Sequence, residues 1–304
     1  MSQTRFEPQG TSRNPTASPP VDPAPRRWAP PPFPGPARWL PPTLAIGAAV
    51  AVWWFLTAVV ASDDPLLSSF APRHAVPAIG DLATRGVLWE DVGASLGRLL
   101  VGLLLAVVVG WPVGLLLGLS ALAERATRPV FQFLRMISPL SWAPVAVAVF
   151  GVGGPPVVFL VAAATVWPVL INTAAGVRAV DPGHLLVARS LGATRVEAVV
   201  TVVVPAIRAH VLTGLRLALG IGWVVLVPAE MLGVASGLGY QILNARDQLA
   251  YDQLMAVILV IGLLGYLLDA LAQRALGQRA VGRRAVGQRG SARRAVGRPA
   301  RRTA

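Results

Sequence analysis

The sequence predicts an all-α integral membrane protein with six transmembrane helices, and three observations lead to that class. Hydrophobic residues make up 54% of the 304 residues and the mean hydropathy is +0.61, whereas soluble domains are about 45–50% apolar. Several apolar runs approach the roughly 20 residues that a helix needs to cross a bilayer. The segments between these runs alternate between arginine-rich and mixed or acidic composition, as inner and outer loops do.

The composition also restricts the chemistry that the chain can perform. There is no cysteine, and the histidines His74, His184 and His210 are too widely spaced to form a ligand pattern, so we predict no metal site. The net charge of +13 comes from arginine alone, because the chain has no lysine and therefore no phosphate-binding P-loop. No nucleophile, base and metal form a set, so we predict no catalytic residues and no bound cofactor. In so apolar a chain the basic charge indicates membrane topology rather than nucleic-acid binding.

Both ends of the chain differ from its centre. Residues 1–42 are rich in proline, serine and threonine, and we predict a disordered cytoplasmic tail. Residues 274–304 contain ten arginines and no acid, so self-repulsion should keep this second cytoplasmic tail extended. The domain between them, residues 43–273, contains the predicted spans 43–61, 99–122, 129–152, 157–176, 211–232 and 253–272, with a long loop at 177–210.

The first spans are defined by their flanks and their small residues. Span 43–61 ends before Asp63 and Asp64, and an amphipathic helix at 88–98 leads into the second span. Within that second span Gly110, Gly114 and Gly118 recur every four residues, a spacing that lets two helix backbones approach closely in lipid. The alternative is the ordinary glycine enrichment of membrane helices.

Prolines interrupt the third and fourth predicted spans. A basic turn with Glu124, Arg125 and Arg128 precedes the third span, which contains Pro139 and Pro144. The fourth contains Trp167, Pro168 and Asn172 and is also expected to be interrupted. Proline frees a backbone carbonyl, which is tolerated at membrane depth only where neighbours or water satisfy it.

The fifth predicted span contains two ionisable residues, Arg216 and Glu230. They lie fourteen residues apart, about 21 Å along a helix, and so cannot pair with each other. An ionisable residue inside the membrane is a functional-site hypothesis by default. We expect Arg216 to reach the membrane interface, and Glu230 to hold a gate or the outer loop rather than to bind an anion, which it would repel.

The loop at 177–210 contains several residues that typically start or end helices. Asp181 is a good N-cap followed by Pro182 at the first helical position. Gly192 supplies a left-handed C′ residue, Thr194 caps a second helix, and Pro205 marks the join to the next apolar run. The sequence therefore predicts a short helix, a glycine turn and a second helix.

This loop resembles the cytoplasmic EAA loop of the permease subunits of bacterial ABC importers. Ala188, Gly192 and Pro205 have the spacing of that motif, whereas Leu186 and Val187 replace its Glu and its first Ala. The longer run ARSLGAT to SGLGY, residues 188–240, resembles the nitrate/sulfonate/taurine branch. The resemblance extends over roughly residues 40–276 and implies the MetI-like permease fold.

The resemblance implies the following expectations. The chain would import a small anion (nitrate, an aliphatic sulfonate or taurine) across the cytoplasmic membrane by alternating access. It would work as a homodimer in the lipid bilayer, with two copies of an ATPase subunit that binds ATP-Mg and a periplasmic or lipid-anchored binding protein. Both termini would be cytoplasmic. The ATPase-coupling residues would be Asp181, Leu186, Ala188, Arg189, Leu191, Gly192 and Pro205. Leu186 would make an apolar contact in place of the family's ion pair.

Candidate residues of the translocation pathway or gate are mostly neutral hydrogen-bond donors. They are Ser138, Ser141, Trp142, Trp167, Asn172 and Trp223, together with Glu230. The alternative for each tryptophan is packing or a position at the membrane interface. Two other functions stay open, an ion-coupled secondary transporter and a non-transporting membrane scaffold, and neither would need an ATPase.

Overall fold

The computed structural model describes residues 40–57 and 69–277, and within these ranges the regular structure is helical, with no β-strand. This confirms the predicted all-α class. Most of the two predicted tails, 1–42 and 274–304, lies outside the described residues. The chain divides after Ala51 into two units, so the helix that crosses this boundary, α1 (Leu40–Phe55), is described by itself. It begins inside the predicted tail, and the end of the first predicted span, 58–61, is not described.

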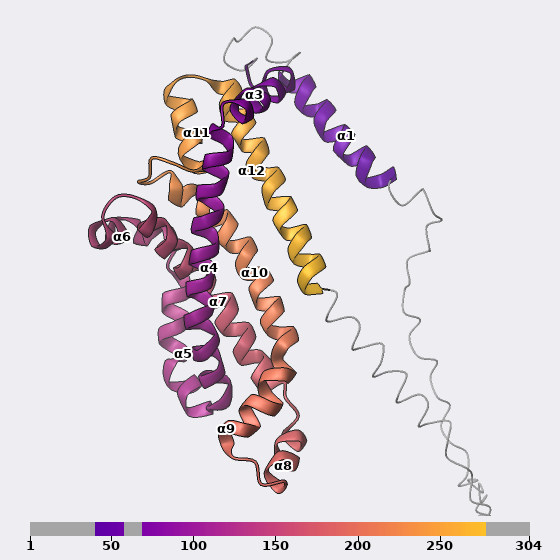
Figure 1. The fold of residues 1–304 in the computed structure, drawn as a ribbon, viewed down its shortest axis with the longest axis vertical. Coiled ribbons are helices and arrows are strands. Elements are labelled where there is room, and N and C mark those ends of the chain that lie inside the picture. Colours follow the sequence, from indigo (N-terminus) through magenta and orange to yellow (C-terminus); the bar gives the residue numbers. More distant parts are fainter. Residues whose placement is uncertain (1–39, 58–68, 278–304) are drawn as a thin grey trace, which may run out of the picture. The chain divides into compact units, whose positions relative to one another are not determined.

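The second unit contains the remaining helices (Figure 1). They are α3 (Pro72–Thr84), α4 (Val87–Leu119), α5 (Ala121–Met136), α6 (Ala143–Phe150), α7 (Gly154–Arg178), α8 (Pro182–Ser190), α9 (Arg195–Ala198), α10 (Val204–Glu230), α11 (Leu238–Asp247) and α12 (Tyr251–Ala272). A 3₁₀ turn covers Pro139–Trp142, and wide π turns cover Val199–Val203 and Gln273–Gly277. Figure 1 shows α4, α7, α10 and α12 running along one another, with α8 and α9 at one end and α3 and α11 at the other.

Four stretches of the described chain are long and apolar enough to cross a membrane. They are Val87–Leu119, Gly154–Arg178, Arg195–Glu230 and Tyr251–Ala275, and a bent pair, Ala121–Met136 with Pro139–Phe150, makes a fifth if it counts as one span. The chain is therefore a multi-pass membrane protein. The apolar part of α1, Leu44–Phe55, is shorter than a full span, so the count of six remains a prediction.

The third predicted span, 129–152, is interrupted, as its prolines indicated. The two helices of the bent pair turn by 86° at the break between them. The residue before a proline is pushed out of the helical region. Accordingly Ser138, which precedes Pro139, has ψ 129°, and Ile137 is also extended, with ψ 126°.

Three smaller predictions differ from the structure. The amphipathic helix at 88–98 and the second span are one helix, α4, which ends at Leu119 rather than 122. Glu124 and the neighbouring arginines lie inside α5 rather than in a turn, because Ser120 caps that helix and accepts from the Ala123 N–H at 3.2 Å. The fourth span is not interrupted, since α7 continues through Pro168, which is buried. Packing against α4 and α10 outweighs the hydrogen bond that Pro168 cannot donate.

The glycine stripe of α4 packs directly against α7, as its spacing predicted. A Cβ atom added at Gly110 would lie 2.9 Å from the Val166 carbonyl oxygen. At Gly114 it would lie 2.7 Å from the Leu170 carbonyl oxygen. At Gly118 it would meet the Val177 side chain at 2.5 Å. Real Cβ atoms do not approach other atoms so closely, and so the two parallel helices depend on glycine at these positions.

We expect Gly114→Ala to lower the stability of the helix pair by about 1–3 kcal/mol, because the added methyl group forces α4 away from the α7 backbone. The matched control is Gly97→Ala on the same helix, where a Cβ would meet nothing within 4 Å. Alanine there should be neutral or slightly stabilising. Thermal unfolding of both variants in the same detergent checks the prediction, and equal midpoints would contradict it.

A second close contact joins α7 to the antiparallel helix α10. A Cβ atom at Gly214 of α10 would lie 2.8 Å from the Asn172 Cβ, and one at Gly222 would lie 2.9 Å from the Thr165 methyl carbon. Thr165 and Thr173 are fully buried, and their hydroxyls donate to carbonyls of α7 itself at 2.7 Å. Helix α7 is therefore the centre of the bundle, because the backbones of α4 and α10 both approach it closely at glycine residues.

Candidate functional site

The segment between α7 and α10 forms the predicted short helix, and its start is capped as the sequence indicated. The Asp181 side chain accepts from the Gly183 N–H at 2.8 Å, and Pro182 occupies the first turn of α8. Gly192 has a φ of 84°, the left-handed conformation that residues with a Cβ rarely adopt. Its N–H donates to the Arg189 carbonyl at 3.0 Å, and the next N–H, of Ala193, donates to Ala188 at 3.0 Å. The end of α8 is therefore a closed turn.

The helix after Gly192 also has a complete N-terminal cap. Thr194 and Glu197 form a capping box: the Thr194 N–H donates to the Glu197 carboxylate at 2.8 Å, and the Glu197 N–H donates to the Thr194 hydroxyl at 3.3 Å. From α9 the chain passes through the π turn Val199–Val203 into α10. Pro205 lies in the first turn of α10, where its missing N–H widens the helix without ending it.

One side of this loop is packed and the other is bare. Val177, Val203 and Ile207 form a buried apolar cluster, with Leu185 of α8 packed against it. By contrast, four apolar side chains on α8, its C-cap and α9 are between 59% and 82% exposed: Leu186, Val187, Leu191 and Val196. The loop is thus fixed to both α7 and α10 and presents an apolar face, here called the α8 face, that nothing in the described chain covers.

A cavity of about 630 Å³ lies beside α7 and brings together three of the predicted pathway residues. Trp142, Trp167 and Asn172 line it, with the end of α5 and one side of α10 completing the wall. Its lining is mostly apolar, and the Asn172 amide donates to the Pro168 carbonyl at 2.8 Å. The cavity is large enough for a small solute and offers it few polar contacts.

The other predicted pathway residues are elsewhere. Ser138 and Ser141 are exposed at the bend between α5 and α6, where the Ser141 N–H donates to the Ser138 carbonyl at 3.0 Å. Trp223 lies on another side of α10 and packs against Gly265 of α12. Ser138, Ser141 and Trp223 do not line the 630 Å³ cavity. The two serines lie at the proline break, and Trp223 lies on a different side of α10.

Glu230 is fully buried at the α11 end of the bundle and holds several elements together. Its carboxylate is 2.6 Å from the Arg98 guanidinium, accepts from the Ser95 hydroxyl at 2.8 Å and accepts from the Gly239 N–H at 3.0 Å. Arg98 also donates to the carbonyl of Ser236 at 2.8 Å. This buried network, here called the Glu230 network, joins α4, α10 and the turn that leads into α11.

The α4 partners in this network were not predicted from the sequence. Asp91, Ser95 and Arg98 lie at intervals of four and three residues, which places them on one face of a helix. That spacing is the signal that could have identified them. The Asp91 carboxylate accepts from the Gly237 N–H at 2.6 Å, and Ser95 accepts from the Leu238 N–H at 2.9 Å. Arg216 of α10 pairs with Asp269 of α12 at 3.2 Å, and both side chains are partly exposed. Its expected position at the membrane interface stays a prediction.

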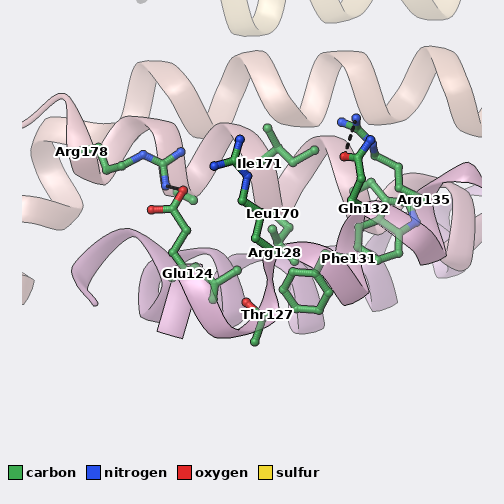
Figure 2. Close-up of a pocket in the computed structure, with 12 residues that line it drawn as sticks. Glu124, Thr127, Arg128, Phe131, Gln132, Arg135, Leu170, Ile171 and Arg178 are labelled. Atoms are coloured by element: carbon green, nitrogen blue, oxygen red, sulfur yellow. Dashed lines mark hydrogen bonds and ion pairs between the residues drawn. The ribbon is translucent and has the colours of Figure 1, made fainter. Parts of the chain in front are cut away.

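A second cavity, of about 210 Å³, lies between α5 and α7 and was also missed (Figure 2). Figure 2 shows polar side chains of α5 that line the pocket together with Leu170 and Ile171 of α7, which form an apolar part of its wall. The charged residues that line it are Glu124, Arg128, Arg135 and Arg178. Glu124 and Arg178 form an ion pair of 3.0 Å.

Most of the described chain matches a known protein family. Residues 102–281 match the model of the binding-protein-dependent transport system inner membrane component family. The match covers more than half of the chain and includes α7, the α8 loop and Glu230, whereas Ser95 and Arg98 precede it. The chain belongs to this family. It is a permease subunit of an ABC importer, in agreement with the resemblance of its loop.

Individual relatives place the permease in one branch of the family. It is 36% identical to the nitrate import permease protein of Leptolyngbya laminosa, over 63% of this chain and 68% of the relative. It is 38% identical to the bicarbonate transport system permease protein of Synechococcus elongatus, over 61% and 66%. It is 34% identical to the taurine transport system permease protein of Escherichia coli, over 75% and 85%.

A solved structure supports the predicted fold of the permease. A chain of the MetNI methionine ABC transporter in an inward-facing conformation aligns with a TM-score of 0.53, covering 64% of this chain and 96% of that chain. The sequence identity is 20%, so this likeness concerns the fold alone.

Proposed function

We propose that the permease forms a homodimer, works with two copies of an ATPase subunit, and receives cargo from a periplasmic or lipid-anchored binding protein. ATP and Mg²⁺ bind to the ATPase, because a chain without lysine has no P-loop of its own. The permease contributes alternating access: closure of the ATPase dimer pushes α8, and the spans tilt from inward-open to outward-open.

The α8 face is the observation that carries this proposal. The α8 face groups several exposed apolar side chains, with Leu186 63% and Leu191 82% exposed. A grouped apolar patch on a surface is typical of a protein–protein contact. Leu185, on the same helix, is packed against the cluster of Val177 and Val203. A push on the α8 face therefore moves α7 and α10 together. Leu186, at the family's Glu position, makes this contact apolar.

We infer a small anion as the cargo, namely nitrate, an aliphatic sulfonate or taurine. Relatives named for nitrate, bicarbonate and taurine transport support a solute with a compact oxyanion group. In the 630 Å³ cavity Trp142, Trp167 and Asn172 offer neutral N–H groups to such a solute. These neutral donors make hydrogen bonds to an anion without forming an ion pair with it, which favours its release.

The α8 end of the bundle is the cytoplasmic end in this proposal. Arg125, Arg128, Arg178 and Arg189 all lie near it, consistent with the excess of arginine in cytoplasmic segments. The α11 end, with the Glu230 network, then faces the periplasm and the binding protein. Both termini of the chain are cytoplasmic.

The test is co-purification of the full chain with an ABC ATPase subunit expressed with it, followed by ATPase measurements in liposomes. We expect the loaded binding protein to stimulate ATP hydrolysis, and the ligand that does so names the cargo. A chain that transports without any ATPase would contradict the proposal and favour the ion-coupled carrier.

The role of the α8 face is tested with a matched pair of substitutions. Leu191→Asp places a charge on the α8 face and should reduce ATPase association at least tenfold, a loss of about 1.4 kcal/mol. Val152, in the turn between α6 and α7, is 80% exposed against 82% for Leu191. Val152→Asp should therefore leave association unchanged, and equal losses in both variants would rule out a specific contact.

A further inference from the structure

The 210 Å³ pocket between α5 and α7 has more positive charge than its own residues neutralise. Three arginines and one carboxylate line it. Arg178 pairs with Glu124, whereas Arg135 only donates to the Gln132 side chain at 3.3 Å. Among the described residues Arg128 has no hydrogen-bond or ion-pair partner. The pocket therefore contains two guanidinium groups that lack a carboxylate.

The two arginines that lack a carboxylate lie at opposite ends of the pocket, and a second arginine lies beside one of them. In Figure 2 the guanidinium groups of Arg128 and Arg178 and the Glu124 carboxylate lie at the same end of the pocket, and Arg135 and Gln132 lie at the other. Trp167 and Phe131 close the pocket with an edge-to-face contact of 5.7 Å between ring centroids. The three arginines are exposed to solvent, and Leu170 and Ile171 form the apolar part of the wall beside them.

The pocket also joins the larger cavity. Arg135, Trp167 and Ile171 line both the 210 Å³ pocket and the 630 Å³ cavity. Arg178 is the last residue of α7, three positions before the α8 cap Asp181. The arginine-lined pocket thus lies between the cavity and the α8 loop, which under the proposed function is the cytoplasmic side.

We propose that the Arg128–Arg178 end of this pocket is a binding site for a small oxyanion, with Glu124 competing against the anion for Arg178. A planar guanidinium presents two parallel N–H donors to a carboxylate, sulfonate, nitrate or phosphate oxygen pair. The volume of 210 Å³ is far above the roughly 10–15 Å³ that one water needs. The competing carboxylate keeps the site weak, so that an anion arriving from the cavity is released.

The inference depends on the proposed function only for the side of the membrane and for the link to cargo. Anion binding itself is measured on the purified full chain without ATPase. We would follow thermal unfolding while sodium sulfate or sodium nitrate replaces sodium chloride at constant ionic strength, and take the anion concentration that gives half of the maximal stabilisation. Loss of this binding would leave the importer assignment intact, and a failed ATPase association would leave the binding result intact.

Three substitutions on one helix make the test specific. Arg128→Gln should raise the half-saturating concentration about tenfold, the contribution of one charge-assisted hydrogen-bonding group. Glu124→Gln should lower it about threefold, because Arg178 is released to the anion. Arg125→Gln removes a charge from the same helix at a position that does not line the pocket, and should change nothing. Misfolding cannot produce opposite shifts, and an equal response to Arg128→Gln and Arg125→Gln would overturn the proposal.

A lipid phosphate could supply the same chemistry as a free anion, and a second arm separates them. The sulfate titration is repeated in nanodiscs of phosphatidylcholine with and without phosphatidylglycerol. A higher half-saturating concentration with the anionic lipid, absent in Arg128→Gln, identifies the lipid headgroup as a competing occupant of the site. An unchanged concentration identifies the free anion as the occupant.

Discussion

Replacing Glu230 by alanine is expected to lower the free energy of unfolding by about 3–5 kcal/mol, because breaking a buried ion pair leaves an uncompensated charge. Glu230 is fully buried and the Arg98 side chain is 13% exposed, with 2.6 Å between them. The same change removes the hydrogen-bond acceptor of the Ser95 hydroxyl and of the Gly239 N–H. Thermal and denaturant unfolding in detergent measure the effect.

The matched control for this prediction is Glu90→Ala, since Glu90 is an exposed acid near the start of α4. It should cost less than about 0.5 kcal/mol, as surface substitutions do. The double variant Glu230→Leu with Arg98→Met removes both charges and should recover part of the lost stability. A Glu230→Ala protein as stable as the control would show that the network is not what holds the α11 turn.

Gly192→Arg is expected to abolish coupling between ATP hydrolysis and transport while the protein still inserts and folds. The φ of 84° at Gly192 is strained by about 1–2 kcal/mol for a residue with a Cβ, although nothing lies within 4 Å of that position. The strain is therefore relieved by moving α8 rather than by unfolding the spans. Transport in liposomes should fall at least tenfold with little change in the unfolding midpoint.

Gly192→Asn is the control that separates backbone conformation from side-chain size. Asparagine tolerates the left-handed region better than other residues with a Cβ, and this variant should keep most of its transport. If Gly192→Arg transports at the wild-type rate, α8 is not the element that transmits the push. If both variants are inactive, the requirement is for an uncovered backbone at Gly192 rather than for its conformation.

Local features of this permease were determined by the sequence itself. Asp181, Gly192 and Thr194 act within a few residues of their own position, so their caps and turn follow from residue type. The four-residue spacing of Gly110, Gly114 and Gly118 likewise predicted a close helix contact, because the period of a helix is fixed. The membrane class followed from apolar run length in the same way.

Tertiary structure decided the features that depend on distant partners. Arg98 and Glu230 are 132 residues apart, and the packing of α4 beside α10, rather than residue type, selects that pair. Glu124 of α5 likewise meets Arg178 at the end of α7, a partner that lies far away in the sequence. Helix periods and caps are local and can be predicted from the chain alone. The choice of which helix faces which is a sum of many weak contacts, and it places the buried carboxylate and the arginine-lined pocket where they are.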